Sequence, residues 1–386
     1  MVTEAKKAQL CKSCGAAALR IRREIAAQGA IPFARFMALA LYDEQGGYYE
    51  QPERPLGRKG DYYTSVCVGR WFCELLAFQF ACWCDELASG PVQLLEAGAH
   101  DGQLAADLLR ALGERRPDLV ARMEYWILEP SVRRRQQQRA SLGGSTGQVR
   151  WFSTWDELPA AGVRGVIFAN ELLDAMPVHV FGWDAAARGW FEWGVTTAGE
   201  GFGWTRLAAP PGLDRGVLSA EGARPWPDLP EELLAVLPNG FTVEISPAAR
   251  AWWTAAARVL SEGILLSLDY GYGADEAVRP ERTGGTARAY AAHHVSAAVL
   301  DQPGLQDLTA HVDFGALGAA GEAAGLTTVA FVSQAEFLTR VLERLQATAT
   351  PFPAWTLARR RQFQTLTHPQ HLGRAFRVLV QRRARP

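Results

Sequence analysis

The chain has 386 residues, of which 48% are hydrophobic and 21% are charged, and its formal net charge at pH 7 is −1. This composition is typical of a soluble globular protein with a sizeable core, built as one large domain with insertions or as two domains. A net charge so near zero argues against a global field that would draw the chain onto nucleic acid or an anionic membrane. The sequence has no apolar run of the ~20 residues that a membrane span needs and no secretory signal at its start, so we expect a cytoplasmic protein without membrane insertion.

All six cysteines lie in the first quarter of the chain, at Cys11, Cys14, Cys67, Cys73, Cys82 and Cys84. The C-x-x-C spacing of the first two is that of half a zinc site, but no second pair follows. His293, His294 and the pair His311 and Asp313 also lack the tight spacing of metal ligands. We therefore expect free thiols, structural histidines and no metal site.

The N-terminal part of the chain, residues 1–90, is predicted to be largely helical. Residues 16–45 carry apolar positions of helical period, which Gly46 and Gly47 end. After a polar loop, residues 69–87 form a second, strongly apolar helix whose aromatic side chains we expect in the core.

The most informative feature is a glycine turn between an apolar run and a helical pattern, in the sequence VQLLEAGAHDG of residues 92–102. A strand, a glycine turn and a helix in that order make the first βα unit of a nucleotide-binding sheet. Glu96, Gly98 and Gly102 have the spacing E-x-G-x-x-x-G, and an acid before the turn suits an ammonium or sulfonium ligand better than a pyrophosphate. This pattern indicates S-adenosyl-L-methionine as cofactor. The alternative is an ordinary βα turn in which Asp101 caps the helix.

Six further strands are predicted, at residues 124–129, 149–152, 165–169, 263–269, 326–332 and 376–381. Seven strands separated by helices favour a doubly wound α/β sheet over residues 91–386. The connection between the fourth and fifth strands is far longer than a crossover requires, which predicts an inserted β-rich subdomain at about 178–246. A second, helical insertion at about 334–370 precedes the last strand.

Acidic residues follow the first two predicted strands. Glu129 ends the second strand, where a carboxylate of this fold accepts hydrogen bonds from the cofactor ribose. A solvated acid at a strand end is the alternative. Glu96 either contacts the cofactor amino group or orients the loop. The charged run at 133–139 is most simply a solvated helix face.

Polar residues also follow the fourth predicted strand: Asn170, Glu171 and Asp174. This is the sheet edge at which open α/β folds bind ligands. Two carboxylates here could hold a cationic acceptor beside the transferable methyl group. The pKa of a guanidinium is above ~12, so the acceptor is protonated at neutral pH. It therefore needs carboxylates to orient it and to take up the proton as the new bond forms. Alternatively, the acids only complement the dipole of a following helix.

The polar segment at residues 58–65 is a candidate lid over the cofactor. Asp61 could meet the cofactor or the acceptor. Thr64 and Ser65 offer hydroxyl groups, or cap the helix that follows.

Eight segments, in chain order, carry a resemblance to a known family: residues 57–65, 96–102, 129–131, 169–179, 243–247, 268–271, 288–290 and 307–314. The strings NE-x-x-DA-x-P from Asn170 and DLTAHVDF from Asp307 are the most specific. The chain resembles the MidA-like, or mitochondrial complex I assembly factor 7-like, methyltransferases from about residue 20 to the C-terminus.

The resemblance implies an S-adenosyl-L-methionine-dependent methyltransferase of the class I type, with a seven-strand sheet. The mitochondrial members are protein-arginine methyltransferases that act on a core subunit of respiratory complex I, so it also implies a protein substrate such as a respiratory-complex subunit. Glu171 looks like the first acid of the double-glutamate loop in the main arginine methyltransferase family.

The sequence departs from the family at two places. His100 replaces the middle glycine of E-x-G-P-G-x-G, and residues 64–69 read TSVCVG where the family has TSPEIS. Two alternatives to arginine methylation therefore stay open. One is a methyltransferase for a different side chain or a small molecule, and the other is a catalytically silent scaffold protein of the same fold.

Overall fold

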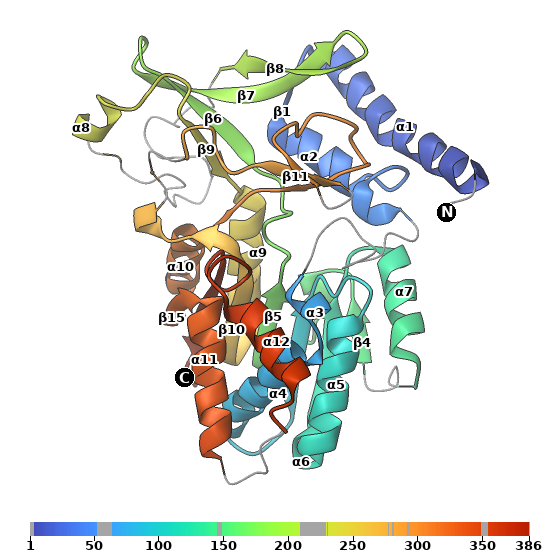
Figure 1. Ribbon diagram of the computed structural model, residues 1–386, viewed down its shortest axis with the longest axis vertical. Helices are drawn as coiled ribbons and strands as arrows, with labels where there is room; N and C mark the ends of the chain where they lie inside the picture. Colours follow the sequence, from blue (N-terminus) through green and yellow to red (C-terminus); the bar gives the residue numbers. More distant parts are fainter. Residues whose placement is uncertain are drawn as a thin grey trace. The chain divides into compact units, whose positions relative to one another are not determined.

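The computed structural model describes residues 4–51, 64–144, 149–208, 229, 231–276, 278–279, 282–291, 294–348 and 354–385. The chain divides into two compact units (Figure 1). Unit 1 comprises Met1–Tyr62, Asp174–Ala251 and Tyr272–Ala316, and unit 2 comprises Tyr63–Leu173, Trp252–Gly271 and Leu317–Pro386. Each unit therefore contains segments that lie far apart in the sequence.

Unit 2 is built on a sheet whose strands, in the described residues, have the order β15-β16-β10-β5-β2-β3-β4. Their bounds are β2 (Val92–Ala97), β3 (Met123–Leu128), β4 (Val149–Phe152), β5 (Val163–Asn170), β10 (Leu260–Tyr272), β15 (Thr327–Ser333) and β16 (Phe376–Arg383). Neighbouring strands from β4 to β10 are parallel, and β16 is antiparallel to both β10 and β15. All seven lie at the segments that the sequence predicts, which confirms the doubly wound sheet. The strand order reverses between β2 and β5, so ligands are expected at their carboxyl ends.

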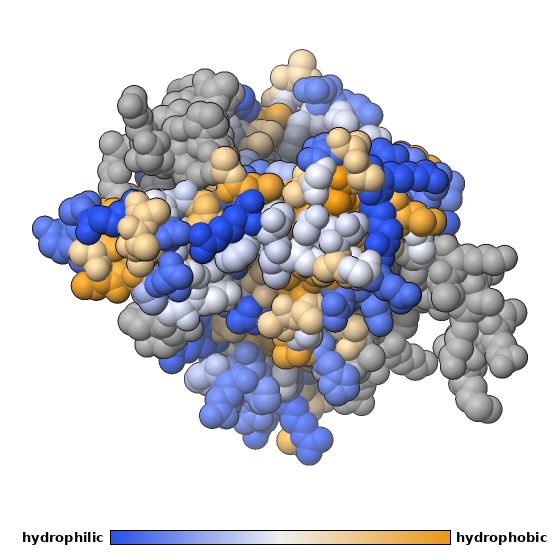
Figure 2. All heavy atoms as spheres, turned by 90° about the horizontal axis from the view of Figure 1, so that it is seen from above, coloured by the Kyte–Doolittle hydropathy of each residue, from blue (hydrophilic) through white to orange (hydrophobic). Residues whose placement is uncertain are grey.

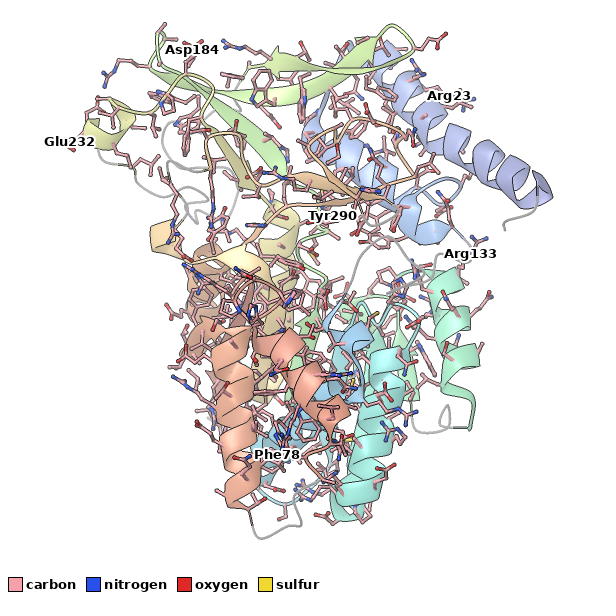
Figure 3. The ribbon with its side chains drawn as sticks, viewed as in Figure 1. Arg23, Phe78, Arg133, Asp184, Glu232 and Tyr290 are labelled. Atoms are coloured by element: carbon pink, nitrogen blue, oxygen red, sulfur yellow. The ribbon has the colours of Figure 1, made fainter. Side chains whose placement is uncertain are left out.

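The helices that belong wholly or partly to unit 2 are α3 (Ser65–Val68), α4 (Arg70–Asp85), α5 (Gln103–Arg115), α6 (Pro117–Val120), α7 (Val132–Leu142), α9 (Pro247–Val259), α10 (Phe314–Ala323), α11 (Gln334–Ala347) and α12 (Leu357–Thr367). The central strands are largely apolar and buried, as expected where helices cover both faces of a sheet. Phe80 of α4 packs on Phe168 of β5 with ring centroids 4.9 Å apart. Phe78, labelled in Figure 3, packs at the edge of the same core.

Unit 1 contains an antiparallel sheet of order β1-β7-β6-β9, with β8 paired to β7, and a small sheet of order β12-β11-β13. The strands are β1 (Ile31–Pro32), β6 (His179–Asp184), β7 (Gly189–Ala198), β8 (Gly201–Leu207), β9 (Thr242–Ile245), β11 (Arg288–Ala291), β12 (His294–Ser296), β13 (Asp307–Thr309) and β14 (Val312–Asp313). The helical elements are α1 (Glu4–Gln28), α2 (Phe33–Tyr42), η1 (Tyr48–Glu50), α8 (Glu231–Leu234) and η6 (Ala274–Glu276). Tyr290, labelled in Figure 3, lies on β11.

The apolar pattern of residues 16–45 predicts one helical region, but the structure divides this segment into α1, β1 and α2. Gly29 has a φ of +80° and ends α1, and Pro32 stands at the N-cap of α2. Between the helices, Ile31 pairs with Val195 of β7. Local periodicity assigns residues 31–32 to a helix, but they form β1, because pairing with the edge of β7 satisfies their backbone groups.

The surface of unit 1 mixes aromatic and cationic side chains. Trp204 on β8 is 42% exposed, and its ring packs on Phe33 of α2. Arg206 lies 4.1 Å above the Phe191 ring, and Arg22 lies 4.9 Å above Phe202. On the face of the molecule seen in Figure 2, hydrophobic residues are interspersed with hydrophilic ones. No helix in the described part of the chain is long and apolar enough to cross a membrane.

Candidate active site

The turn that joins β2 to α5 needs glycine at two positions. Gly98 has a φ of +68°, and a Cβ there would lie 2.6 Å from Leu172 Cδ1. Gly102 has a φ of +87° and occupies the N-cap position of α5. Asp101 accepts a hydrogen bond from the Gln103 amide at 3.1 Å. The segment is therefore a true glycine turn, and Asp101 also satisfies one of the free N–H groups that begin the helix.

His100 stands in this turn with a φ of +46°, a backbone conformation that favours glycine. Its Nδ1 is buried and has no hydrogen-bond partner in the described residues, although Asp101 Oδ1 lies 3.8 Å away. Burial lowers the pKa of His100, and the Asp101 carboxylate opposes that shift. The imidazole is therefore neutral at neutral pH.

Glu96 is only 3% exposed, and its Oε2 accepts a hydrogen bond from the Tyr125 hydroxyl at 2.5 Å. Burial raises the pKa of Glu96 to about 8, against the opposing effect of that hydrogen bond. The carboxyl group consequently keeps its proton at neutral pH until a cation approaches it.

Glu129, immediately after β3, is held by two donors. Its Oε1 accepts the Ser131 amide at 3.0 Å, and its Oε2 accepts Gln138 Nε2 at 3.1 Å. Gln138 Nε2 also donates to the His100 carbonyl at 3.1 Å, and Gln138 Oε1 accepts Trp151 Nε1–H at 3.0 Å. One side chain thereby ties the glycine turn to the acid expected at the ribose.

Gln138 was missed by sequence reasoning, which takes residues 133–139 as a solvated face. That interpretation holds for Arg133, which is exposed on α7 (Figure 3). It is wrong for Gln138, which is 0% exposed, and for Arg134, which is 8% exposed. The uniformly polar run conceals the buried face, because a buried glutamine with all its partners in place costs little.

Glu171 follows β5 with a φ of +54°. Its Oε1 accepts the Ser65 amide at 2.9 Å and Asn170 Nδ2 at 3.0 Å, whereas no described residue donates a hydrogen bond to Oε2. Asn170 Oδ1 is buried and also has no partner in the described part of the chain. Burial raises the pKa of Glu171 to about 8, and the nearby Asp269 carboxylate adds to the shift. The site therefore presents one carboxylate oxygen and one amide oxygen that lack donors.

Asp269 of β10 explains the unusual backbone at Glu171. It is 0% exposed, and its Oδ2 accepts the amides of Leu172 at 3.1 Å and Leu173 at 2.8 Å. Its Oδ1 accepts the amide of Tyr270 at 2.8 Å. A strained conformation persists where its surroundings over-determine it, and Asp269 supplies that restraint. The sequence marks Asp269 as the end of a predicted strand and as part of the family-like segment at 268–271, but assigns it no role at the site.

The lid segment is described from Thr64 onward, so Asp61 lies outside the described residues. Thr64 is the N-cap of α3, and its hydroxyl accepts the Cys67 amide at 3.2 Å. Ser65 is not the cap. Its amide holds Glu171, and its buried hydroxyl donates to Gln334 Oε1 at 3.1 Å.

Asp174 belongs to unit 1, in which it is 8% exposed and its carbonyl accepts the Ala310 amide at 2.9 Å. Residues 171–178 form turns and bends, so no helix begins there for these acids to complement. Within the described residues, no group of three His, Cys, Asp or Glu side chains is placed to hold a metal ion.

Curated relatives match most of the chain. A fruit fly (Drosophila melanogaster) protein named "Protein arginine methyltransferase NDUFAF7 homolog, mitochondrial" is 27% identical over 95% of this chain and 84% of its own length. The zebrafish (Danio rerio) protein arginine methyltransferase NDUFAF7 is also 27% identical, over 75% of this chain and 68% of its own. Both are named as mitochondrial proteins. The expectation of a cytoplasmic protein is therefore contradicted by the relatives.

A solved structure and a family model agree on the reaction class. A protein from Burkholderia thailandensis, solved bound to S-adenosyl-homocysteine, is 31% identical with a TM-score of 0.80, over 97% of this chain and 93% of its own. The cofactor is accordingly S-adenosyl-L-methionine. The family model described as "Putative S-adenosyl-L-methionine-dependent methyltransferase" matches residues 67–332. The chain belongs to this family of S-adenosyl-L-methionine-dependent methyltransferases.

Proposed function

We propose that the enzyme transfers a methyl group from S-adenosyl-L-methionine to an arginine side chain of a protein partner. The observation that carries the proposal is the Glu171 carboxylate, whose Oε1 is held by Ser65 and Asn170 while Oε2 has no described donor. The names of the curated relatives, as protein arginine methyltransferases, support the same acceptor.

The residues at the carboxyl ends of β2, β3 and β5 fit the cofactor. Glu129 is held in place by the Ser131 amide and Gln138 Nε2, and its carboxylate would accept the ribose hydroxyls of the cofactor. Gly98 and Gly102 allow the backbone to approach a ligand, and the orphaned Asn170 Oδ1 offers an acceptor to a ligand N–H group. When bound, the cofactor supplies an electrophilic methyl group on its sulfonium. Glu96, beside the turn, would orient the loop or meet the cofactor amino group.

On the acceptor side, Glu171 responds to a cation. Its raised pKa of about 8 means that the free carboxyl is largely protonated at neutral pH. A guanidinium beside Oε2 favours the ionised form, so the proton leaves and a charge-assisted hydrogen bond forms. As a guanidino nitrogen accepts the methyl group it releases a proton, and Glu171 is the base that takes it. Alignment of the in-line displacement supplies the remaining acceleration.

The sequence adds three further parts to this proposal. Asp174 assists on the acceptor side, and Asp61 and Thr64 act at the cofactor. The family resemblance extends the proposal to a respiratory-complex subunit as the protein partner.

The test compares the wild type with Glu171→Gln, using tritiated S-adenosyl-L-methionine and a heat-treated extract of the source cells as acceptor. We expect methylarginine in the wild-type product, located by mass spectrometry, and turnover about 100-fold lower in the variant. Cofactor affinity, measured by calorimetry, stays the same because the ribose contacts lie on another loop.

Near-normal turnover in Glu171→Gln would overturn the arginine mechanism. Methyl groups on a different side chain or a small molecule would instead identify another acceptor. Absence of cofactor binding at millimolar concentration would indicate a silent scaffold protein.

A further inference from the structure

Gln334, the first residue of α11, occupies an unusual place for a glutamine. It is 0% exposed, and its two polar atoms join separate elements. Oε1 accepts the Ser65 hydroxyl of α3 at 3.1 Å, and Nε2 donates to the Leu366 carbonyl at 3.0 Å. Leu366 lies in the last turn of α12, where carbonyl groups lack helical partners. Gln334 therefore uses both its acceptor and its donor, and an apolar residue in its place would lose both hydrogen bonds.

Ser65 carries this connection to the site. It is also 0% exposed, so its hydroxyl has no access to water as an alternative partner. The backbone amide of the same residue donates to Glu171 Oε1 at 2.9 Å. The two hydrogen bonds of Ser65 are thus in series, one to the helical insertion and one to the glutamate.

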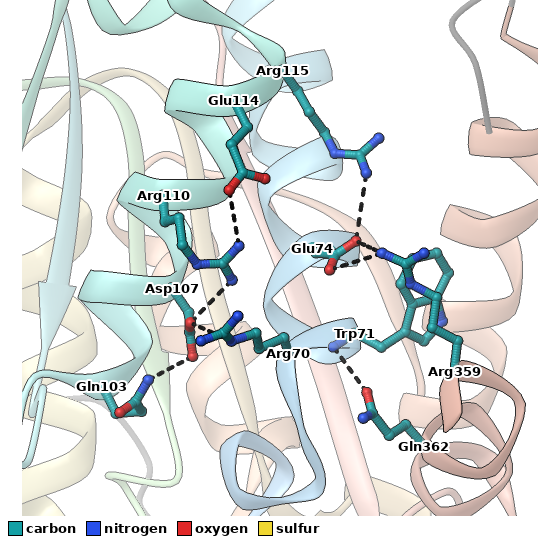
Figure 4. Close-up of polar contacts among 10 residues, drawn as sticks. All are labelled: Arg70, Trp71, Glu74, Gln103, Asp107, Arg110, Glu114, Arg115, Arg359 and Gln362. Carbon is teal, nitrogen blue, oxygen red and sulfur yellow. Dashed lines mark hydrogen bonds and ion pairs between the residues drawn. The ribbon is translucent and has the colours of Figure 1, made fainter. Parts of the chain in front are cut away.

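The helical insertion is itself anchored beside α3. Figure 4 shows Gln362 of α12 accepting the Trp71 amide at the start of α4, at 3.1 Å. In the same figure Arg359 pairs with Glu74 of α4 at 2.9 Å. Gly69, with a φ of +140°, separates α3 from α4, and a Cβ there would lie 2.5 Å from the Gln362 side chain. These contacts fasten α12 to α4 separately from the bonds that Gln334 makes to Ser65 and Leu366.

We infer that Gln334 is a positioning residue for Glu171, which it acts on through the hydroxyl of Ser65. The inference rests on the proposed function, because that function gives the Glu171 carboxylate its role in the reaction. By this inference the helical insertion before the last strand contributes to the acceptor site indirectly, through Ser65.

The charges around Glu171 allow the effect to be measured. The Ser65 amide and the Asn170 side chain stabilise the ionised carboxylate, while Asp269 of β10 opposes ionisation. Cys67 of α3 lies within the electrostatic influence of Glu171, and its thiol stays neutral because burial raises its pKa. Loss of the Ser65 amide therefore raises the pKa of Glu171 further.

The experiment is a carboxyl ¹³C NMR titration of glutamate-labelled protein, with Glu171 assigned from Glu171→Gln. In Gln334→Met, which keeps side-chain length but removes both hydrogen bonds, the Glu171 midpoint should rise by about one pH unit, the scale of one donor to a carboxylate. Glu96 is the internal control: it also titrates near 8, is bonded to Tyr125, and should not move.

Two further variants make the result decisive. Ser65→Ala removes only the hydroxyl that Gln334 holds. Without that bond the Ser65 amide is no longer fixed against Glu171 Oε1, so the variant should raise the Glu171 midpoint as Gln334→Met does, with less risk to folding. Gln362→Met is the matched control, since it removes a hydrogen bond to α4 but has none to Ser65. Amide exchange at Ser65 should accelerate in Gln334→Met and Ser65→Ala and not in Gln362→Met.

An unchanged Glu171 midpoint in folded Ser65→Ala would overturn the inference, as would an equal movement of Glu96 or an equal effect of Gln362→Met. The titration contains no methyl acceptor. A failure to find methylarginine would therefore not contradict the inference about Gln334. An unchanged Glu171 midpoint would not contradict the proposed reaction.

Discussion

Two non-glycine residues at the site, His100 and Glu171, have left-handed backbone. Such conformations cost roughly 1–3 kcal/mol and persist where surrounding contacts impose them. Asp269 imposes the one at Glu171 through the amides that follow it. The Gln138 bond to the His100 carbonyl plays the corresponding part in the glycine turn. His100 lies in the glycine turn that we assign to the cofactor, and Glu171 is the residue that we assign to the methyl acceptor.

His100→Gly should stabilise the fold by up to about 1 kcal/mol, since glycine adopts a positive φ without steric cost and the buried, unpaired Nδ1 is removed. Urea unfolding measures the change. His100→Ala is the control, because alanine also removes the imidazole but keeps the left-handed strain, so it should gain less stability than His100→Gly. A glycine variant less stable than the wild type would mean that the imidazole holds the turn.

The pH dependence of stability follows from Glu171. Its pKa is raised from 4.5 to about 8 by burial, so the folded state keeps a proton that the unfolded state releases. Its contribution is fully present below about pH 4.5 and is lost as pH rises to about 8. Glu171→Gln should therefore gain stability relative to the wild type at pH 8 compared with pH 5.

Urea unfolding at the two pH values measures that difference. Glu343→Gln, at an exposed position on α11, is the control, and its difference in unfolding free energy from the wild type should be the same at both pH values. An identical pH dependence of wild type and Glu171→Gln would show that Glu171 is ionised throughout the range.

Among the elements, α7 contributes more to the site than its sequence indicates. Its N-cap Ser131 and its buried Gln138 both engage the groups around Glu129. The helix thus presents one face to the cofactor loop and another, with Arg133, to solvent.

Gln138→Leu should weaken cofactor binding by about tenfold or more, the scale of a lost hydrogen bond to a carboxylate. Calorimetry with S-adenosyl-homocysteine measures the dissociation constant. Gln137→Leu, an exposed neighbour on the same helix, is the matched control. Equal affinity in the two variants would place the ribose away from Glu129.

For the whole molecule, ligand binding and stability are coupled. A ligand that binds only the folded state at 100 times its dissociation constant adds about 2.7 kcal/mol. We expect S-adenosyl-homocysteine to raise the melting temperature of the wild type, and Glu129→Ala to lose most of that rise at the same ligand concentration. Differential scanning fluorimetry measures both. A full rise in Glu129→Ala would remove Glu129 from the cofactor site.

The assembly of unit 1 from three separate segments could not be predicted from local patterns. Ile31 pairs with Val195 of β7, a strand more than 150 residues further along the chain. The strands β11 to β13 have only three or four residues each. Strands this short show no measurable alternation, so periodicity cannot detect them. Their existence depends on partners supplied by the rest of the fold.

The sequence by itself determined the seven-strand sheet, the glycine turn and the placing of Glu96, Glu129 and Glu171 at strand ends. These features are local, because an apolar run bounded by glycine or acid marks a buried strand without reference to the rest of the chain. Only the tertiary structure decided that Gln138, Asp269 and Gln334 support those residues. A buried polar side chain is stable only when distant partners satisfy it, and a sequence does not show which partners folding brings within hydrogen-bonding distance.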